Sequence, residues 1–208
     1  MMGRTNGKDF DMKERKGVMT RTTGETDITA VLDLDGSGVA AVDTGIGFFD
    51  HMLNSFARHG FFDLSLSAKG DLFVDSHHTV EDVGIVLGKT IKDAVGDKAG
   101  IRRYASFTMP MDDALVLCAV DLSGRPYLSY DLELTVPRVG YFDTEMTKEF
   151  FYAVSYAAEM NLHLRQLSGS NNHHIIEAAF KAFANALHLA TRIDDRLDGE
   201  ILSTKGSL

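Results

Sequence analysis

The chain has 208 residues, of which 44% are hydrophobic and 25% are charged, and its formal net charge is −9. This length and composition suit one soluble globular domain, or two halves that share a core. The negative charge argues against a nucleic-acid partner and against a membrane surface. The one cysteine, Cys118, lies in an apolar run. It predicts neither a disulfide framework nor a zinc ribbon, and it favours a cytoplasmic location.

The first half of the chain begins with a polar stretch and continues as alternating strands and helices. We expect residues 1–14 to form a flexible N-terminal extension, because they carry no apolar pattern. Apolar residues alternate along 28–34, as in a half-buried strand. Helical spacing predicts a helix over 48–59, alternation predicts a strand over 62–68, and the apolar positions of 80–91 predict another helix.

The second half repeats this order. A helix is predicted over 147–160, a strand over 161–165 and a last helix over 176–187. Matching positions are 88 residues apart early in each half and 96 to 98 apart later, which predicts about ten extra residues around 136–142. We place the boundary near Gly100, so that residues 15–100 and 101–208 form the two halves of one domain.

Each half therefore consists of three strands, a helix, a strand and a helix. Two four-stranded sheets, each packed with two helices, would bury the apolar face of every element. The expected fold class is an internally duplicated α+β fold, whose arrangement resembles the ribosomal protein S5 domain 2-like fold.

A repeated motif points to metal chemistry. Each copy has two adjacent histidines followed by a glutamate, in the segments 77–81 and 173–177. Positions i and i+4 of a helix share one face, so His77 with Glu81, and His173 with Glu177, can hold one metal each. The second histidine of each copy points about 100° away. The repeat also matches His51 to Glu149.

Eight side chains thus form two sets of metal-ligand candidates. We predict one metal held by His51, His77, Glu81 and His174, and another held by His78, Glu149, His173 and Glu177. Imidazole and carboxylate ligands suit Mn, Fe, Co or Zn. Four protein ligands around an octahedral ion leave two positions for substrate or water, as catalysis requires.

The chain resembles the imidazoleglycerol-phosphate dehydratase family from about residue 15 to the C-terminus. The resemblance is carried by linked motifs in the segments 21–26, 47–53, 75–82, 103–104, 110–115, 123–126, 171–177 and 203–206. It implies the dehydration of D-erythro-imidazole glycerol phosphate to imidazole acetol phosphate in L-histidine biosynthesis. It further implies a dinuclear Mn(II) site that binds the imidazolate form of the substrate, formed at subunit interfaces of a 24-subunit homo-oligomer.

The resemblance also assigns roles to individual residues. Glu25 matches the family's substrate-binding glutamate and is the expected general base, while Asp113, its approximate repeat partner, is a weaker candidate. Many family members carry a histidine where this chain has Glu149, so this metal site is expected to be more anionic and to favour Mn over Zn. Further catalytic roles are expected for Glu81, Glu177 and His78. Phosphate binding is expected from Arg103, Arg125, Ser203 and Lys205.

Two other functions use the same residues. A dinuclear phosphoester hydrolase also needs two metals with open positions, but it would release phosphate. Metal sites that only join subunits would instead have closed coordination.

Overall fold

The computed structural model describes residues 14–208, and the predicted N-terminal extension lies outside the described residues except for Glu14. The first six elements are β1 (Lys16–Thr22), β2 (Thr26–Asp33), β3 (Ala40–Asp43), α1 (Gly47–Gly60), β4 (Asp63–Gly70) and α2 (His77–Val95). The following elements are β5 (Tyr104–Met111), β6 (Ala114–Asp121), β7 (Tyr127–Asp131), β8 (Arg138–Val139), β9 (Phe142–Asp143), α3 (Met146–Ala157), β10 (Asn161–Ser168), α4 (Asn172–Thr191) and the 3-10 turn η1 (Asp195–Leu197).

The two large sheets have the same topology. Their strand orders are β1-β2-β4-β3 and β5-β6-β10-β7. In each sheet the edge strand that precedes the helix, β3 or β7, runs parallel to its neighbour, and the other pairs are antiparallel. This confirms the predicted α+β class with two four-stranded sheets and four helices.

The halves differ by one insertion. The β8–β9 hairpin stands between β7 and α3, where the change in repeat offset predicts extra residues. Gly100 lies in the connection from α2 to β5. The division of the chain at this glycine stays a prediction.

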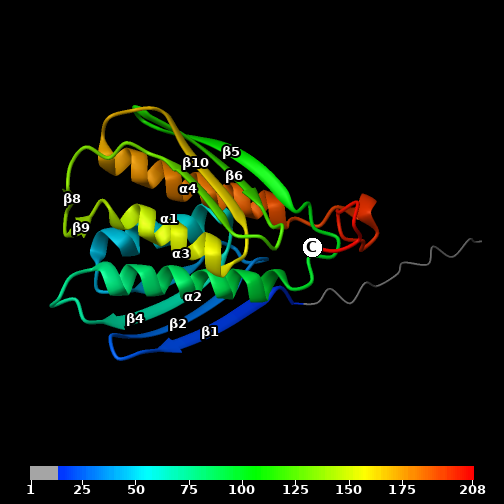
Figure 1. Ribbon diagram of the computed structural model, residues 1–208, viewed down its shortest axis with the longest axis horizontal. Helices are drawn as coiled ribbons and strands as arrows, with labels where there is room; N and C mark the ends of the chain where they lie inside the picture. The colour runs from blue at the N-terminus through cyan, green and yellow to red at the C-terminus, as the bar shows by residue number, and fades with distance from the viewer. Residues whose placement is uncertain (1–13) are drawn as a thin grey trace, which may run out of the picture.

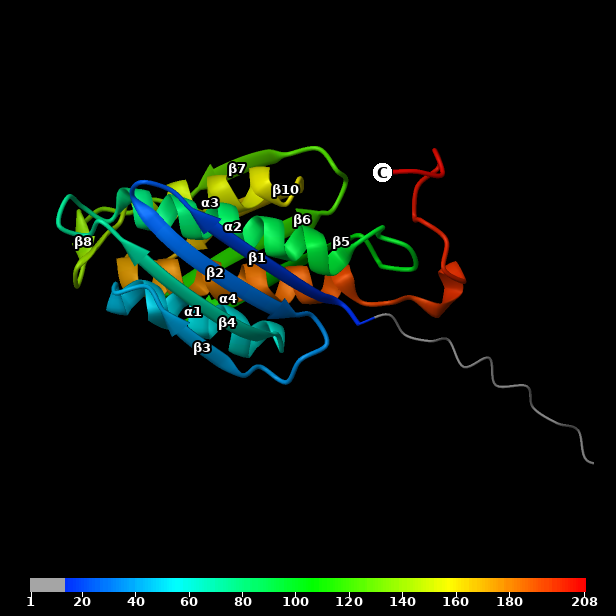
Figure 2. The same cartoon turned by 90° about the horizontal axis from the view of Figure 1, so that it is seen from below.

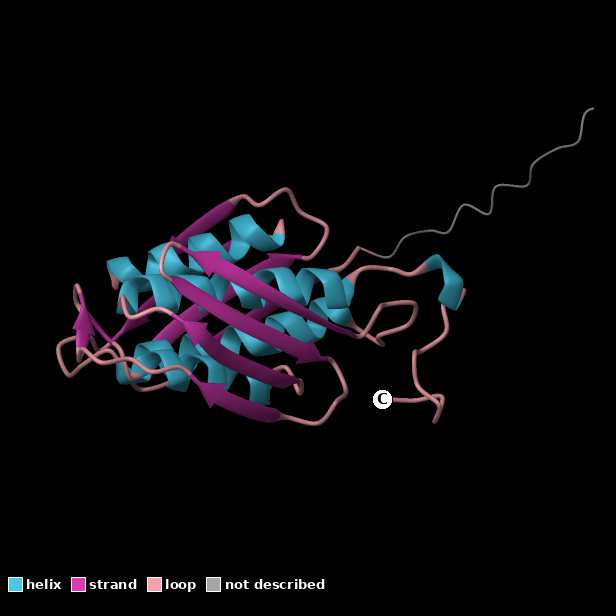
Figure 3. Cartoon of the chain, turned by 90° about the horizontal axis from the view of Figure 1, so that it is seen from above, coloured by secondary structure: helices cyan, strands magenta, loops and turns pink. Residues whose placement is uncertain are grey.

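The four helices lie between the two sheets, as Figure 1 shows. Strands cover the helices when the molecule is viewed from below and from above (Figures 2 and 3). Helix α2 packs on β1 and β2, and α4 packs on β5 and β6, while the two layers meet where α2 contacts α3 and α1 contacts α4. Within the described part of the chain, residues 14–208, no helix has the length and apolar character needed to cross a membrane.

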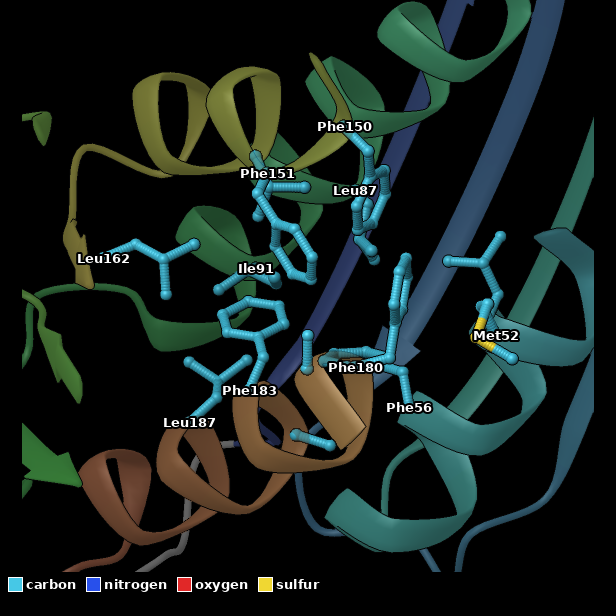
Figure 4. Packing of buried hydrophobic residues seen from close by; sticks show 14 of the residues in the cluster. Met52, Phe56, Leu87, Ile91, Phe150, Phe151, Leu162, Phe180, Phe183 and Leu187 are labelled. Atoms are coloured by element: carbon cyan, nitrogen blue, oxygen red, sulfur yellow. The ribbon is translucent and has the colours of Figure 1, made fainter. Parts of the chain in front are cut away.

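Aromatic side chains fill the space between the helices (Figure 4). Phe150 stacks on Phe180 with ring centroids 5.0 Å apart, and Phe56 stacks on Phe183 at 5.4 Å. All four side chains are at most 1% exposed. Cys118 is fully buried, and burial raises the pKa of its thiol. The core is therefore shared by both halves rather than split between them.

Helices α2 and α3 approach closely because glycines line the contact. A Cβ built on Gly84 would lie 2.8 Å from the Ala153 Cβ, and one on Gly88 would lie 2.7 Å from the Val154 carbonyl oxygen. Contacts that advance together along both helices mean that α2 and α3 run parallel. Their N-terminal turns consequently lie at the same end of the molecule.

Substituting alanine for Gly88 is expected to lower the free energy of unfolding by about 1 to 3 kcal/mol, because the new methyl overlaps backbone that cannot move freely. Alanine favours a helix by about 1 kcal/mol over glycine, so any net loss reports the overlap. Denaturant unfolding measures the change. Gly47→Ala is the control, since a Cβ there meets nothing within 4 Å; equal losses in both variants would contradict the packing argument.

Candidate metal centre

The helices that carry the histidine motifs begin at those motifs. Asn171 caps α4, its side-chain oxygen accepting from the backbone N–H groups of His173 and His174 at 3.0 and 3.4 Å. Asp75 accepts from the backbone N–H of His77 at 2.8 Å. Such caps satisfy N–H groups that have no partner inside the helix. They also fix the first turn, from which the imidazoles project.

One cluster of three ligands forms where α1 contacts α4. Potential ligand atoms of His51, His173 and Glu177 all lie within 4.8 Å of one another. The Glu177 Oε2 atom is 3.7 Å from the His51 Nε2 and 3.2 Å from the His173 Nε2. The His173 ring also packs against Phe48 in a T-shaped pair, with centroids 5.0 Å apart. These contacts hold both imidazoles beside the carboxylate.

A mostly buried lysine lies beside this carboxylate. The Lys181 ammonium donates to the Glu177 Oε1 at 2.6 Å, and both side chains are mostly buried. Burial by itself would raise the pKa of the Glu177 carboxyl, but the hydrogen bond and charge of Lys181 lower it below its usual value. Glu177 is therefore ionised, with Oε2 facing the histidines.

The other motif forms a similar pair on α2. The His77 Nε2 lies 3.6 Å from the Glu81 Oε2, one helical turn away, and both side chains are partly exposed. Glu149 lies in the first turn of α3 and is partly buried. It directly precedes Phe150, whose carbonyl oxygen would be 2.9 Å from a Cβ on Gly84. Because α2 and α3 are parallel, Glu149 lies at about the same height along α3 as Glu81 does along α2.

The grouping of ligands differs from the predicted one. The sequence predicts His51 with His77, Glu81 and His174, and predicts His173 and Glu177 with His78 and Glu149. Within the chain, α1 packs against α4 and brings His51 to His173 and Glu177 instead. Which of the eight residues share one ion stays a prediction.

The second histidine of each motif is held by an aspartate. The Nδ1 atom of His78 lies 3.0 Å from the Asp71 carboxylate, and that of His174 lies 2.7 Å from Asp113. The hydrogen bond with Asp71 raises the pKa of His78 above its usual value. A carboxylate on Nδ1 fixes the ring and makes Nε2 the better metal ligand. Both rings are therefore oriented to bind through Nε2.

The two acidic candidates for a general base have different surroundings. Glu25 is exposed in the β1–β2 turn, where its Oε1 lies 3.8 Å from the His78 Nε2. Asp113 accepts from the backbone N–H groups of Ser170 and Asn171 at 2.7 and 3.1 Å, in addition to its contact with His174. These hydrogen bonds hold the pKa of Asp113 far below its usual value. Glu25 is consequently the carboxylate with lone pairs available for a substrate proton.

The donor set suits a divalent cation. Two imidazole nitrogens and one buried, ionised carboxylate within 4.8 Å provide mixed nitrogen and oxygen ligands. That combination matches Mn, Fe, Co or Zn rather than a thiolate-bound metal. The three ligands from one chain leave coordination positions for other groups.

The four predicted phosphate-binding residues lie together at the opposite end of the molecule from the histidine cluster. A cleft of about 550 Å³ is lined by residues that include Arg103, Arg125, Ser203 and Lys205. Arg103 binds Asp121 through two nitrogens, at 2.8 and 3.1 Å. It also donates to the Leu202 carbonyl at 2.9 Å, which ties the C-terminal tail to β5.

Within one chain, this cleft is far from the histidine cluster. Figure 1 shows the C-terminal segment, which lines the cleft, beyond the end of α4. The backbone N–H of Arg103 donates to the Ala190 carbonyl near the end of α4, whereas His173 lies at its beginning. Positions 173 and 190 are 17 residue steps apart along the helix. At about 1.5 Å per residue this is about 26 Å, longer than a small phosphorylated metabolite can span.

Sequence reasoning missed two residues that shape the site. Lys181 is one turn beyond Glu177, so helical spacing was an available signal. Asp71 precedes His78 by seven residues and reaches it across a loop, which no periodic pattern predicts.

Comparison with known proteins agrees with this architecture. The family model described as imidazoleglycerol-phosphate dehydratase matches residues 44–187. Imidazoleglycerol-phosphate dehydratase of Lachnoclostridium phytofermentans is 63% identical, over 93% of this chain and 98% of its own length. The enzyme of Acetivibrio thermocellus is 60% identical, over 94% of this chain and its entire length.

Solved structures of the same name superpose on the fold. The dehydratase of Staphylococcus aureus has a TM-score of 0.78 and 38% identity, covering 86% of this chain and 99% of that one. The Pyrococcus furiosus protein has a TM-score of 0.80 and 37% identity, covering 91% of this chain and all of that one. The chain therefore belongs to the imidazoleglycerol-phosphate dehydratase family.

Proposed function

We propose that this chain removes water from D-erythro-imidazole glycerol phosphate to give imidazole acetol phosphate, a step of L-histidine biosynthesis. The observation that carries the proposal is the cluster of His51, His173 and the buried Glu177, in a chain of this family. The lone, buried Cys118 supports the cytoplasm as the compartment.

We propose that the chain supplies two sets of metal ligands. One is His51, His173 and Glu177. The other is His77, Glu81 and Glu149, because Glu149 corresponds to His51 in the repeat and lies at the level of Glu81. His78 and His174 would complete the sites of a neighbouring subunit through Nε2. Two Mn(II) ions are the proposed cofactors; such cations depress the pKa of an imidazole ligand and stabilise its anion.

The protein's own groups would then move the proton. The carbon that loses hydrogen is weakly acidic, so a carboxylate must be held within hydrogen-bond reach of it. Glu25 is the proposed carboxylate, since it is exposed and lies beside His78. Glu81, Glu177 and His78 would take part by holding the reacting ring and its cations in place.

The distance between the metal-ligand cluster and the phosphate cleft supports an active site built from more than one subunit. Because about 26 Å of helix lies between the ligand cluster and the phosphate cleft, one chain cannot offer both to one substrate. We propose that Arg103, Arg125, Ser203 and Lys205 of one subunit bind the phosphate of a substrate held at another subunit's metals. A 24-subunit homo-oligomer is the proposed arrangement.

The test is a product assay. Mn-loaded protein is incubated with imidazole glycerol phosphate, and the enolisable ketone and free phosphate are both measured. The proposal predicts ketone with the phosphate retained. Release of phosphate would instead support the phosphoester hydrolase, and neither product would support metals that only join subunits.

Deleting residues 201–208 is expected to raise KM by about ten- to a hundredfold, because charge-assisted hydrogen bonds to phosphate contribute about 1.5 to 3 kcal/mol each. The deletion removes Ser203 and Lys205 from the cleft wall. Steady-state kinetics measure the effect, and metal analysis provides the control. Loss of bound metal equal to the loss of affinity would contradict the separate locations of the two sites.

A further inference from the structure

Asp82 is a buried carboxylate that joins α2 to the β1–β2 turn. It is 7% exposed and directly follows Glu81 in the chain. Its Oδ1 accepts from the Arg21 Nε at 2.9 Å, and its Oδ2 accepts from the Thr26 hydroxyl at 2.6 Å. A buried charge is costly to desolvate unless it is paired and hydrogen-bonded. Both oxygens of Asp82 are committed to elements that flank Glu25.

The β1–β2 turn is held together by hydrogen bonds among its own residues. The Thr23 hydroxyl oxygen accepts from the backbone N–H groups of Glu25 and Thr26 at 3.1 and 3.0 Å. The Thr23 N–H donates to the Thr26 carbonyl at 2.8 Å. Whatever fixes Thr26 therefore also fixes Glu25, its immediate neighbour.

A second connection ties the same turn to His78. The Asp71 backbone N–H donates to the Glu25 carbonyl at 3.1 Å, while the Asp71 carboxylate holds the His78 Nδ1 at 3.0 Å. The backbone at Glu25 is consequently tied to the beginning of α2 through both Asp82 and Asp71. The connection through Asp82 is buried, and the connection through Asp71 lies nearer the surface.

The second half of the chain lacks this arrangement. The position that corresponds to Asp82, 96 residues later, is Ala178. There the turn residue Asp113 binds the start of α4 directly, through Ser170, Asn171 and His174. A device needed only to fasten a turn to a helix would be expected in both halves. The buried aspartate instead occurs in the half that carries Glu25.

We propose that Asp82 is a positioning residue for the general base, acting through Thr26 to set the place of Glu25 relative to His78 and Glu81. The inference rests on the proposed function, since it presumes that Glu25 accepts the substrate proton. A carboxylate displaced by about 1 Å from its reacting hydrogen loses about a hundredfold in rate.

Thr26→Val tests the connection, because valine keeps the shape of threonine and removes the hydroxyl. We expect kcat to fall about ten- to a hundredfold, with KM and bound metal unchanged. With substrate deuterated at the carbon that loses its proton, the kinetic isotope effect on kcat should increase, as proton abstraction becomes slower. Thr26→Ser should restore wild-type kinetics. Should Thr26→Val fail to fold, Asp82→Asn is measured in the same way.

Thr29→Val is the matched control. Thr29 lies on the same strand and shares an exposed hydroxyl contact with Thr20 at 3.1 Å, away from α2. We expect its kcat and isotope effect to equal those of the wild type. If Thr26→Val behaves like this control, the positioning proposal is overturned.

A double variant distinguishes positioning from general damage. If Asp82 and Thr26 act through Glu25, then Thr26→Val should cause no further loss in a Glu25→Gln background. An equal fold-loss with and without Glu25 would overturn the proposal while leaving the dehydratase function intact. A wild-type protein that forms no ketone would refute the proposed function itself. Full turnover by Glu25→Gln would refute both the role of Glu25 as the base and the role of Asp82 in positioning it.

Discussion

Stripping the divalent metal with a chelator is expected to reduce ketone formation to background, and adding Mn(II) back is expected to restore it. The reason is chemical: the substrate hydrogen to be removed is weakly acidic, and the chain's own carboxylates cannot supply the positive charge that stabilises an electron-rich ring. Metal Lewis acids typically contribute several kcal/mol to such steps. Dehydration that survives complete metal removal would contradict the proposed chemistry.

A ligand variant makes this prediction specific to one cluster. His173→Ala is expected to lower the amount of Mn bound per chain and to abolish turnover, because it removes one of three convergent ligands. His163→Ala is the control, since His163 is an exposed histidine of β10 that packs on Tyr127. Metal content measured on the purified, dialysed proteins separates the two. Equal metal content in both variants would exclude His173 from the site.

Local relations along a helix were predictable from the sequence. His77 with Glu81, and His173 with Glu177, lie together because positions i and i+4 share a face, whatever surrounds the helix. The order of strands and helices was predictable from local patterns as well. Alternation and helical spacing record which face of each element is buried, and the observed β4, α1 and α3 match the predicted ranges to within three residues at either end.

The pairing of helices was not predictable in this way. Phe49 of α1 meets Phe180 of α4 in the core, with ring centroids 6.5 Å apart, and this contact carries His51 to Glu177. Hydrophobic periodicity marks both faces as buried but does not say which face meets which. The sequence therefore did not predict that His51 lies beside His173 and Glu177.

The separation of metal ligands from phosphate ligands follows from element lengths. Every proposed metal ligand lies in the first turns of a helix, whereas Arg103 and Ser203 follow the C-terminal ends of α2 and α4. Because α2 has 19 residues and α4 has 20, the two ends of each helix are about 30 Å apart. The sequence motifs name candidate residues for the site without stating how far apart the fold places them.

Glu25→Gln is expected to lower kcat by about 10²- to 10⁴-fold while leaving bound Mn and substrate affinity unchanged. Glutamine keeps the size and hydrogen-bonding reach of glutamate but cannot accept the substrate proton. Metal should stay because Glu25 is not part of the His51–His173–Glu177 cluster, and its nearest ligand candidate, His78, is 3.8 Å away.

The control for this variant is Asp27→Asn. Asp27 is an exposed carboxylate two residues along β2 that accepts a hydrogen bond from the Thr22 hydroxyl at 2.9 Å. Neutralising it changes the net charge of the chain by the same amount without touching the turn's carboxylate. Steady-state kinetics of both variants therefore separate proton transfer from local charge. Wild-type turnover by Glu25→Gln, or an equal loss in Asp27→Asn, would assign the proton to another group.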